Sequence, residues 1–382
     1  MARGARPWRL ALERALARMW WAPAPTAWAH ALRPLAWLYG RLAESRADSG
    51  RRLANARPAL TVPVWVVGNV VVGGAGKTPV VLALIDALQR AGHRPGVVSR
   101  GYGRHSGHDG ARAVADHDDA GKVGDEALLL RRRGRVPVFV GADRHAAAQA
   151  LLHAHPEVDI LLSDDGLQHT RLARQLEIVV FDERGIGNGL LLPAGPLREP
   201  WPPRADDPGA ASRLVLYNAD RSSLPGPGAL LERGLGRAWP LAAWWRGDAS
   251  AARPLTALQG RPLLALAGLA APEKFFVMAR AHGLSIQTWP QPDHAPYPAA
   301  PWPSGTRDVI TTEKDAVKLR PDWASSVEQD AADPSQDSRP RVWVLPLDSR
   351  VPQDWFTAAC DRTWGRAASP PPGRAPLPAD EP

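Results

Sequence analysis

The sequence has very little cysteine. Cys360 is the only one among 382 residues, which excludes an intrachain disulfide and a metal cluster built on several cysteines. This composition fits a reducing compartment, with the cytosol as the default expectation. Because 45% of the residues are apolar, the chain has material for the cores of two α/β domains and is expected to be globular.

Long apolar runs and internal repeats are also missing. Near the N-terminus Arg18, Pro23 and Arg33 interrupt each apolar stretch well short of the ~20 residues that span a bilayer. A cleaved signal peptide is disfavoured because prolines break its would-be apolar core, although Ala29-His30-Ala31 loosely resembles a cleavage site. No membrane-spanning segment is therefore predicted.

Net charge is absent from most of the chain. The formal net charge of the whole chain is +8. Residues 1–57 alone carry eleven arginines against three acidic residues, so the positive and negative charges of the remaining chain balance. The same segment holds five of the sixteen tryptophans, and arginine with tryptophan suits the headgroup layer of a membrane. The pattern indicates attraction to an anionic surface, either lipid or nucleic acid. An amphipathic helix packed on its own domain is an equal alternative.

Short β-branched runs alternate with helical stretches from about Val62 to Asp182, which predicts a doubly wound α/β domain with a mainly parallel sheet. A proline-rich connection at 193–210 precedes a second, smaller α/β set. The predicted parts are an N-terminal helical segment 1–57, a first domain 58–205, a second domain 206–365 and a disordered tail 366–382. The main expected strands are Val62–Val67, Gly96–Ser99, Val136–Val140, Val158–Ser163, Leu176–Phe181, Leu214–Tyr217, Leu263–Ala267, Ser285–Trp289, Asp308–Thr312 and Arg341–Leu345, and the main expected helices are Lys77–Ala91, Asp125–Arg133, Asp143–His155, Pro272–His282 and Lys314–Leu319.

A glycine-rich loop follows the first predicted strand and ends where a helix is predicted to begin. Its glycines let backbone amides turn toward a chain of phosphates, its lysine can reach the β- and γ-phosphate oxygens, and its threonine can bind Mg²⁺. The strict motif requires glycine at position 71, where this chain has valine, so the loop is a variant. A glycine turn with an incidental lysine is the alternative. The loop residues are Gly73, Gly74, Ala75, Gly76, Lys77 and Thr78.

Polar residues follow two other predicted strands at the same edge of the sheet. Asp164 and Asp165 come after Val158–Ser163, where one carboxylate would bind Mg²⁺, with a simple turn as the alternative. Arg100 and Tyr102 follow the second strand and offer a guanidinium for phosphate and a ring for stacking. Together with the loop, these residues predict a site for ATP and Mg²⁺.

Asp125 and Glu126 open a predicted helix, where the ordinary alternative for Asp125 is a helix N-cap. With the segments above, the chain resembles the tetraacyldisaccharide 4'-kinase family, the lipid A 4'-kinases of Gram-negative bacteria, over about residues 8–348. Ala75 stands where family members often carry a small hydroxyl residue. The similar segments, in order, are Gly73–Pro79, Ser99–Gly103, Val123–Glu126, Asp164–His169, Leu192–Glu199, Pro292–His294 and Thr312–Lys318.

The resemblance implies phosphorylation, by ATP with Mg²⁺, of the 4'-hydroxyl of a tetraacylated glucosamine disaccharide 1-phosphate. It implies that Asp125 accepts the hydroxyl proton, that His294 assists from the second domain, and that Lys77 holds the triphosphate. The implied place is the cytoplasmic face of the bacterial inner membrane, where the protein would be peripheral and bind the anionic membrane surface, with neither nucleic acid nor an obligate protein partner. The implied metal contacts are Thr78, Asp164 and Asp165 with Glu126 in support, and the implied substrate contacts are Arg100, Tyr102, Arg144, His169 and Arg198.

Two other functions fit part of the pattern. A P-loop NTPase switch of the partitioning or metal-delivery type would share the phosphate loop and the metal-binding aspartate. It would have no need of Asp125, His294 and Arg198 around one substrate. A basic nucleic-acid binder is supported by charge alone and predicts salt-sensitive retention on DNA.

Overall fold

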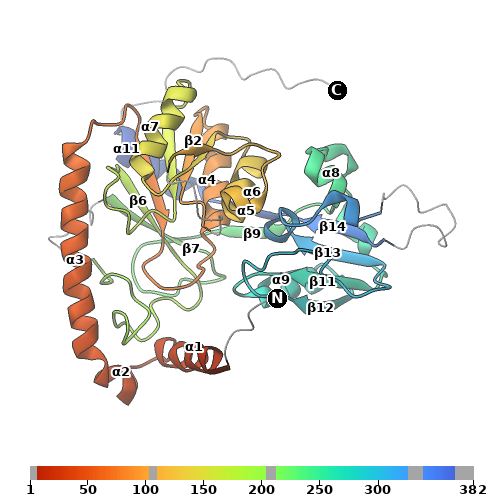
Figure 1. Ribbon diagram of the computed structural model, residues 1–382, viewed down its shortest axis with the longest axis horizontal. Helices are drawn as coiled ribbons and strands as arrows, with labels where there is room; N and C mark the ends of the chain where they lie inside the picture. Colours follow the sequence, from red (N-terminus) through yellow and green to blue (C-terminus); the bar gives the residue numbers. More distant parts are fainter. Residues whose placement is uncertain (1–6, 103–109, 204–211, 326–338, 366–382) are drawn as a thin grey trace. The chain divides into compact units, whose positions relative to one another are not determined.

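The computed structural model describes residues 7–102, 110–203, 212–325 and 339–365, and the predicted tail at 366–382 lies outside them (Figure 1). The chain divides into two compact units. Unit 1 is drawn from Met1–Val98, Asp143–Leu231 and Val351–Pro382, and unit 2 from Ser99–Ala142 and Glu232–Arg350. Each unit therefore combines segments that are far apart in the sequence.

The sheet of unit 1 is parallel, with the strand order β2-β5-β1-β6-β7-β8. The strands β1, β2, β5 and β6 are buried along their whole length, as expected for a parallel sheet that helices cover. The α/β class with a large, mainly parallel sheet is thus confirmed. The strands are β1 (Val64–Gly68), β2 (Pro95–Ser99), β5 (Ile160–Asp164), β6 (Leu176–Phe181), β7 (Arg213–Tyr217) and β8 (Ala229–Leu230), and the helices are α4 (Lys77–Arg90), α7 (Arg144–Ala154) and α11 (Gln353–Trp364).

Two elements of unit 1 differ from the sequence-based assignment. Leu214–Tyr217 was expected in the second domain, but β7 pairs in parallel with β6 of unit 1. Helix α11 was not predicted, and it also belongs to unit 1. Trp355 Nε1 on α11 donates to the carbonyl oxygen of Val215 over 3.0 Å, and Trp65 Nε1 on β1 donates to Thr363 Oγ1 over 2.8 Å. The first sheet therefore continues beyond the proline-rich stretch.

The N-terminal segment is helical and forms α1 (Pro7–Trp20), α2 (Ala27–Ala31) and the long α3 (Arg33–Ala56) (Figure 1). Side-chain hydrogen bonds hold these helices to the rest of unit 1. Trp20 Nε1 donates to Pro193 O over 2.8 Å, Asn188 Nδ2 to Met19 O over 3.1 Å, and Tyr39 Oη to Arg198 O over 3.1 Å. Among the described helices, none is both long and apolar enough to cross a membrane.

Unit 2 contains a five-stranded sheet in the order β10-β14-β13-β11-β12, parallel except at the β10–β14 pair. Two antiparallel pairs, β3 with β4 and β9 with β15, complete its strands in the described residues. The strands are β3 (Arg112–Ala113), β4 (Val138–Val140), β9 (Glu232–Leu235), β10 (Trp239–Pro240), β11 (Leu263–Ala267), β12 (Ile286–Pro290), β13 (Asp308–Thr312), β14 (Arg341–Leu345) and β15 (Leu347–Arg350), and the α-helices are α5 (Ala120–Val123), α6 (Asp125–Gly134), α8 (Leu241–Arg246), α9 (Pro272–Ala281) and α10 (Glu313–Ala316).

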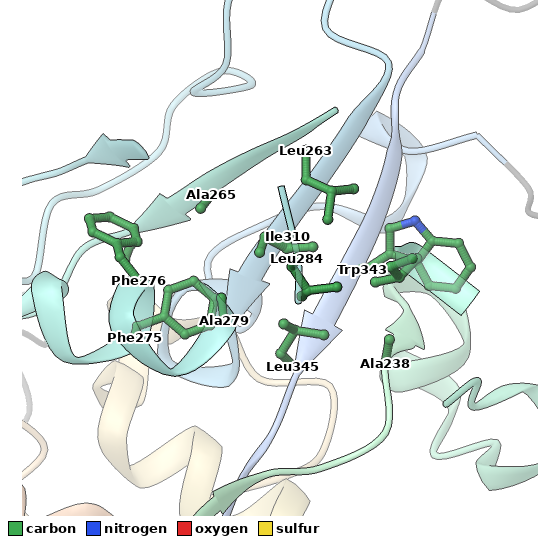
Figure 2. Packing of buried hydrophobic residues seen from close by; sticks show 12 residues of the cluster. Ala238, Leu263, Ala265, Phe275, Phe276, Ala279, Leu284, Ile310, Trp343 and Leu345 are labelled. Atoms are coloured by element: carbon green, nitrogen blue, oxygen red, sulfur yellow. The ribbon is translucent and has the colours of Figure 1, made fainter. Parts of the chain in front are cut away.

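The core of unit 2 lies between α9 and its sheet (Figure 2). Phe275, Phe276 and Ala279 share one face of α9 because their spacing follows the helical period. They pack with side chains of β11, β13 and β14, including Ile310 and Leu345. This packing fixes the carboxyl end of β11, which Gly268 follows, and that of β13, which ends at Thr312. The loops that follow these strands carry part of the site described below.

Residues 99–142 group with unit 2 because side chains of α6 contact residues of the 232–350 segment. The Arg132 guanidinium lies 4.2 Å from the centre of the Trp245 ring and donates to its carbonyl oxygen. Arg133 pairs with Glu313 at 3.3 Å and with Asp348 at 2.7 Å. These partners are more than a hundred residues away along the chain, so continuous sequence patterns do not reveal the grouping.

Candidate active site

The glycine-rich loop of unit 1 joins β1 to α4 and ends at a glycine whose backbone conformation and surroundings disfavour any side chain. Gly76 is the N-cap of α4 and has a φ of 70°, in the left-handed region that favours glycine. A Cβ on Gly76 would lie 1.8 Å from Asn218 Nδ2, whose amide donates to the carbonyl oxygens of Ala75 and Gly76 over 3.3 Å each. Because glycine offers no capping oxygen, the first amides of α4 are suited to bind an anion.

Lys77 is the first residue of α4, and its ammonium group lies among oxygen atoms. Its Nζ is 3.4 Å from Asp165 Oδ1 and 3.4 Å from Asn69 Oδ1. Asn69 Nδ2 in turn donates to the carbonyl oxygen of Gly73 over 3.1 Å. The asparagine thus joins the lysine to the glycine turn, and the predicted loop and the predicted aspartate come together in one place.

Asp164 and Thr78 provide oxygen atoms suited to a hard cation. Asp164 ends β5, is buried, and lies opposite Val67 in the register of β1 and β5. Thr78, also buried, is the second residue of α4. Across the described ranges no group of three or more His, Cys, Asp or Glu side chains could hold a metal. With nucleotides, Mg²⁺ usually takes phosphate oxygens and water among its ligands.

Arg198 lies beside the glycine-rich loop because the chain around it runs along the start of that loop. Arg198 N donates to Val70 O over 2.7 Å, and Val72 N donates to Pro196 O over 2.9 Å. The Arg198 guanidinium is 4.0 Å from Asp165 Oδ1. The predicted substrate contact and the predicted metal contact are therefore neighbours in unit 1.

Three residues of this site were missed from the sequence, namely Asn69, Arg184 and Asn218. Arg184 donates to the carbonyl oxygen of Gly74 over 2.8 Å and pairs with Asp182 at 2.6 Å, and its guanidinium lies 4.3 Å from the centre of the Trp21 ring. The position of Arg184 could have indicated a role, because Arg184 follows the carboxyl end of β6. Strand β6 pairs in parallel with β1, the strand that precedes the glycine-rich loop. Asn218 likewise follows the end of β7. Side chains at the carboxyl edge of a parallel sheet are candidates for ligand contact.

Arg144 and His169, both predicted substrate contacts, are close enough to influence each other. Arg144 is buried at the start of α7, where Asp143 caps the helix. Burial lowers the pKa of His169 to about 4, and the cations of Arg144 and Arg174 add to this effect. His169 is therefore neutral near pH 7, and only Arg144 of this pair carries positive charge.

In unit 2, Asp125 begins α6 but does not cap it. Gly124 is the N-cap, with a φ of 95° and a ψ of 140°, and a Cβ there would lie 2.7 Å from Tyr102 O. The Asp125 carboxylate is buried. Its Oδ1 accepts from Glu126 N over 2.9 Å, and its Oδ2 lies 2.9 Å from His294 Nδ1. The structure thus brings together the two residues that the family resemblance assigns to proton transfer.

The charges around Asp125 keep it ionised. Burial by itself raises the pKa of Asp125, but the hydrogen bond from His294 and the cation of Lys314 outweigh it, so the pKa lies below its ordinary value. The hydrogen bond to Asp125 raises the pKa of His294, while burial and Lys314 oppose the rise. Asp125 is therefore a carboxylate near neutral pH and able to accept a proton.

Two other predicted contacts of unit 2, Tyr102 and Glu126, lie near this pair. The Tyr102 ring meets the His294 ring edge to face, with centres 5.5 Å apart, and is 65% exposed. Arg100 is exposed two residues before it. Glu126 Oε1 is 3.4 Å from Lys314 Nζ, so it pairs with a lysine here.

The predicted residues thus fall into two groups. The resemblance assigns Asp125 and His294 to different domains, whereas both lie in unit 2. Unit 1 holds Gly73, Gly74, Ala75, Gly76, Lys77, Thr78, Arg144, Asp164, Asp165, His169 and Arg198, and unit 2 holds Arg100, Tyr102, Asp125, Glu126 and His294.

Comparison with known proteins identifies the family. The model of the family tetraacyldisaccharide-1-P 4'-kinase matches residues 28–363. A tetraacyldisaccharide 4'-kinase of Methylibium petroleiphilum is 51% identical over 358 residues, covering 93% of this chain and 94% of that protein. One of Leptothrix cholodnii is 50% identical over 327 residues, covering 86% and 90%. The crystal structure of "apo" form LpxK from Aquifex aeolicus in complex with ATP shares the fold, with a TM-score of 0.65, 24% identity, and coverage of 88% of this chain and 99% of that one. The chain therefore belongs to the tetraacyldisaccharide-1-P 4'-kinase family.

Proposed function

We propose that this protein transfers the γ-phosphate of ATP to the 4'-hydroxyl of a tetraacylated glucosamine disaccharide 1-phosphate. Its family consists of ATP-dependent kinases of lipid A biosynthesis that phosphorylate a hydroxyl group. The observation that carries the proposal is the 2.9 Å contact between Asp125 and His294, which gives unit 2 an ionised, oriented carboxylate. A nucleotide-driven switch needs no such group.

Asp125 acts as the general base. As the hydroxyl oxygen attacks the γ-phosphorus, Asp125 accepts its proton, a new O–P bond forms, and the bond from the γ-phosphorus to the bridging oxygen breaks to release ADP. His294 orients the carboxylate and stabilises its charge. The reaction requires the phosphate held by the loop at 73–78 to reach the hydroxyl beside Asp125.

Unit 1 supplies the groups that hold the nucleotide. Lys77 and the amides of the glycine loop would bind the phosphates, and Thr78 with Asp164 or Asp165 would hold Mg²⁺. Bound Mg²⁺ neutralises charge on the transferred phosphoryl group. Because Glu126 pairs with Lys314, a supporting metal contact from it would require that ion pair to open.

The acceptor carries a phosphate at its 1-position, and cationic side chains suit that group. Arg198 is the strongest candidate, because backbone bonds fix its position beside the phosphate loop. Arg144 and Arg100 offer further guanidinium groups, neutral His169 offers a hydrogen-bonding ring, and exposed Tyr102 offers a ring that can stack on a sugar.

We further propose that the N-terminal helices contact the anionic cytoplasmic face of the inner membrane, where an acylated acceptor resides. Trp28 is 78% exposed and Trp37 is 68% exposed. Leu35, Leu38 and Leu42 are also exposed, and their spacing gives them one face of α3. Exposed tryptophan and leucine on an arginine-rich segment suit a headgroup layer.

The test uses purified protein, γ-labelled ATP and a tetraacylated disaccharide 1-phosphate in detergent. We expect label in the lipid product, and a loss of turnover of about 10²–10⁴-fold in Asp125→Asn, since that is the range for a general base. ATP binding should be unchanged in Asp125→Asn. The control Asp354→Asn removes an exposed carboxylate on α11 and should keep full turnover. Label found only in free phosphate would instead support a nucleotide-driven switch.

A further inference from the structure

The segment from Thr312 to Lys318 is rich in charge yet largely buried. Glu313 and Asp315 are 5% and 0% exposed. Charged side chains are rarely buried without partners, so the partners indicate what such a segment does. Glu313 faces Arg133 and Trp244, whereas Lys314 and Asp315 face the loop that carries His294. The reaction proposed above gives no role to Glu313, Lys314 or Asp315.

The Lys314 ammonium group lies among three polar atoms around His294. Its Nζ lies 2.9 Å from Asp293 Oδ1, 3.2 Å from His294 Nε2 and 3.4 Å from Glu126 Oε1. An ammonium group carries three N–H donors and no lone pair. One of these atoms is the histidine nitrogen that does not face Asp125.

This contact bears on which nitrogen of the neutral His294 ring carries the proton. Because an ammonium group can only donate, a hydrogen bond from Lys314 requires a lone pair on Nε2, and the proton of neutral His294 is then on Nδ1. Nδ1–H is the form that donates to Asp125 Oδ2 at 2.9 Å. The opposite tautomer would place an N–H against the ammonium and a lone pair against the carboxylate.

Asp315 holds the same loop at a second point. Its carboxylate accepts from Gly268 N over 2.9 Å and from Tyr297 Oη over 2.8 Å. His294, three residues before Tyr297, has a φ of 56°, which is uncommon for a residue other than glycine. A loop in such a conformation persists only when its surroundings hold it, and α10 does so on both sides of His294.

We propose that Lys314 is a positioning residue that keeps His294 in the Nδ1–H tautomer, so that His294 orients Asp125 for proton transfer. The inference rests on the proposed kinase reaction for its catalytic meaning. The tautomer itself is a property of unit 2 and can be measured without substrate.

The test begins with the wild-type protein labelled with ¹⁵N-histidine, with the His294 signals assigned by their loss in His294→Gln. The nitrogen shifts should show a protonated Nδ1 and an unprotonated Nε2. In Lys314→Met, which keeps side-chain length but removes the donor, we expect loss of that single-tautomer pattern. A wild-type spectrum with the proton on Nε2, or an unchanged pattern in a folded Lys314→Met, would overturn the proposal.

Kinetics provide the second readout. Lys314→Met should lower kcat on the order of 10–100-fold, by analogy with the loss of groups that orient metal-binding side chains, with KM for ATP unchanged. Lys314→Arg, which can still donate, should restore part of the rate. Lys274→Met on α9 is the matched control and should keep the wild-type rate. If the wild type only hydrolyses ATP and transfers no phosphate to the lipid, the proposed function is wrong. The measured tautomer of His294 would remain valid in that case.

Discussion

His169 is a histidine whose pKa falls when the protein folds. Burial, with help from Arg144 and Arg174, lowers its pKa to about 4, compared with about 6.5 in an unfolded chain. Between these values the unfolded state binds the proton more tightly than the folded state. The free energy of unfolding should therefore fall as the pH drops from about 6.5 to about 4.

Replacing His169 by Gln should remove this part of the acid sensitivity. Within the window the wild type should lose stability faster than the variant, by at most ~1.4 kcal/mol per pH unit. Urea unfolding at several pH values across the window provides the measurement. His30→Gln, at an exposed histidine of α2, is the control and should follow the wild-type curve. Parallel curves for His169→Gln and the wild type would mean that His169 titrates normally.

The sequence predicts single site residues only where local pattern carries the chemistry. The glycine loop, Lys77 and the aspartates after β5 follow from strand and helix context. Asp125 and His294 depend on family resemblance, because His294 has no local signal beyond Asp293. Asn218 and Lys314 act through partners more than a hundred residues away in the sequence. Hydrophobic periodicity along the sequence does not reveal contacts between residues so far apart.

Helix α7 begins at an aspartate that has two roles. Asp143 Oδ1 accepts from His145 N and Ala146 N over 3.0 and 3.3 Å, and the carboxylate pairs with Arg57 through two bonds of 2.8 and 2.7 Å. The Arg57 guanidinium, with the helix amides, holds the pKa of Asp143 well below its usual range. The cap positions Arg144, the next residue, at the start of the helix.

Asp143→Ala should destabilise the protein by about 1–2 kcal/mol near pH 7, mostly through loss of the cap, because the partly exposed ion pair adds at most ~1 kcal/mol. Since folding lowers the pKa of Asp143, its contribution is present above the unfolded pKa of about 3.9 and is lost as the pH falls below it. Urea unfolding at about pH 7 and about pH 3 measures this difference. Asp86→Ala breaks an exposed pair with Arg90 on α4 and should cost less than ~0.5 kcal/mol. Equal losses in both variants would contradict the capping role.

Regular elements with a full hydrophobic pattern were predicted well. The predicted bounds of β6, β11, β13 and β14 agree with the structure. The strands β3, β8 and β10 have two residues each, which is too short for any periodicity. Strand β7 was found but assigned to the wrong sheet, because sequence order suggested a new domain after the prolines while pairing with β6 is settled by tertiary contact.

The N-terminal helices combine residues that pack with residues that remain exposed. Trp20 and Tyr39 form hydrogen bonds with the rest of unit 1, whereas Trp28 and Trp37 are exposed. The segment therefore contains residues that fit packing on its own domain and residues that fit contact with a membrane surface. A deletion of the whole segment would remove both kinds of contact, so substitutions at the exposed positions give the clearer test.

The double substitution Trp28→Ala and Trp37→Ala should weaken sedimentation with vesicles that contain anionic lipid, since each ring offers apolar surface to the headgroup layer. Thermal stability should be nearly unchanged because the rings are exposed. Val277→Ala removes an exposed hydrophobic side chain of α9 and should sediment like the wild type. If the double variant sediments equally well, these tryptophans do not contribute to membrane contact.

The division of the chain into two units limits how the protein can be expressed as fragments. Unit 1 takes three stretches of the chain and unit 2 takes two, so the backbone passes between them four times. A product that stops before Val351 lacks α11 and, with it, the hydrogen bonds to Trp65 and Val215. Neither unit can be expressed as one uninterrupted fragment. Any two-piece version of this protein should need co-expression of both pieces to recover a folded product.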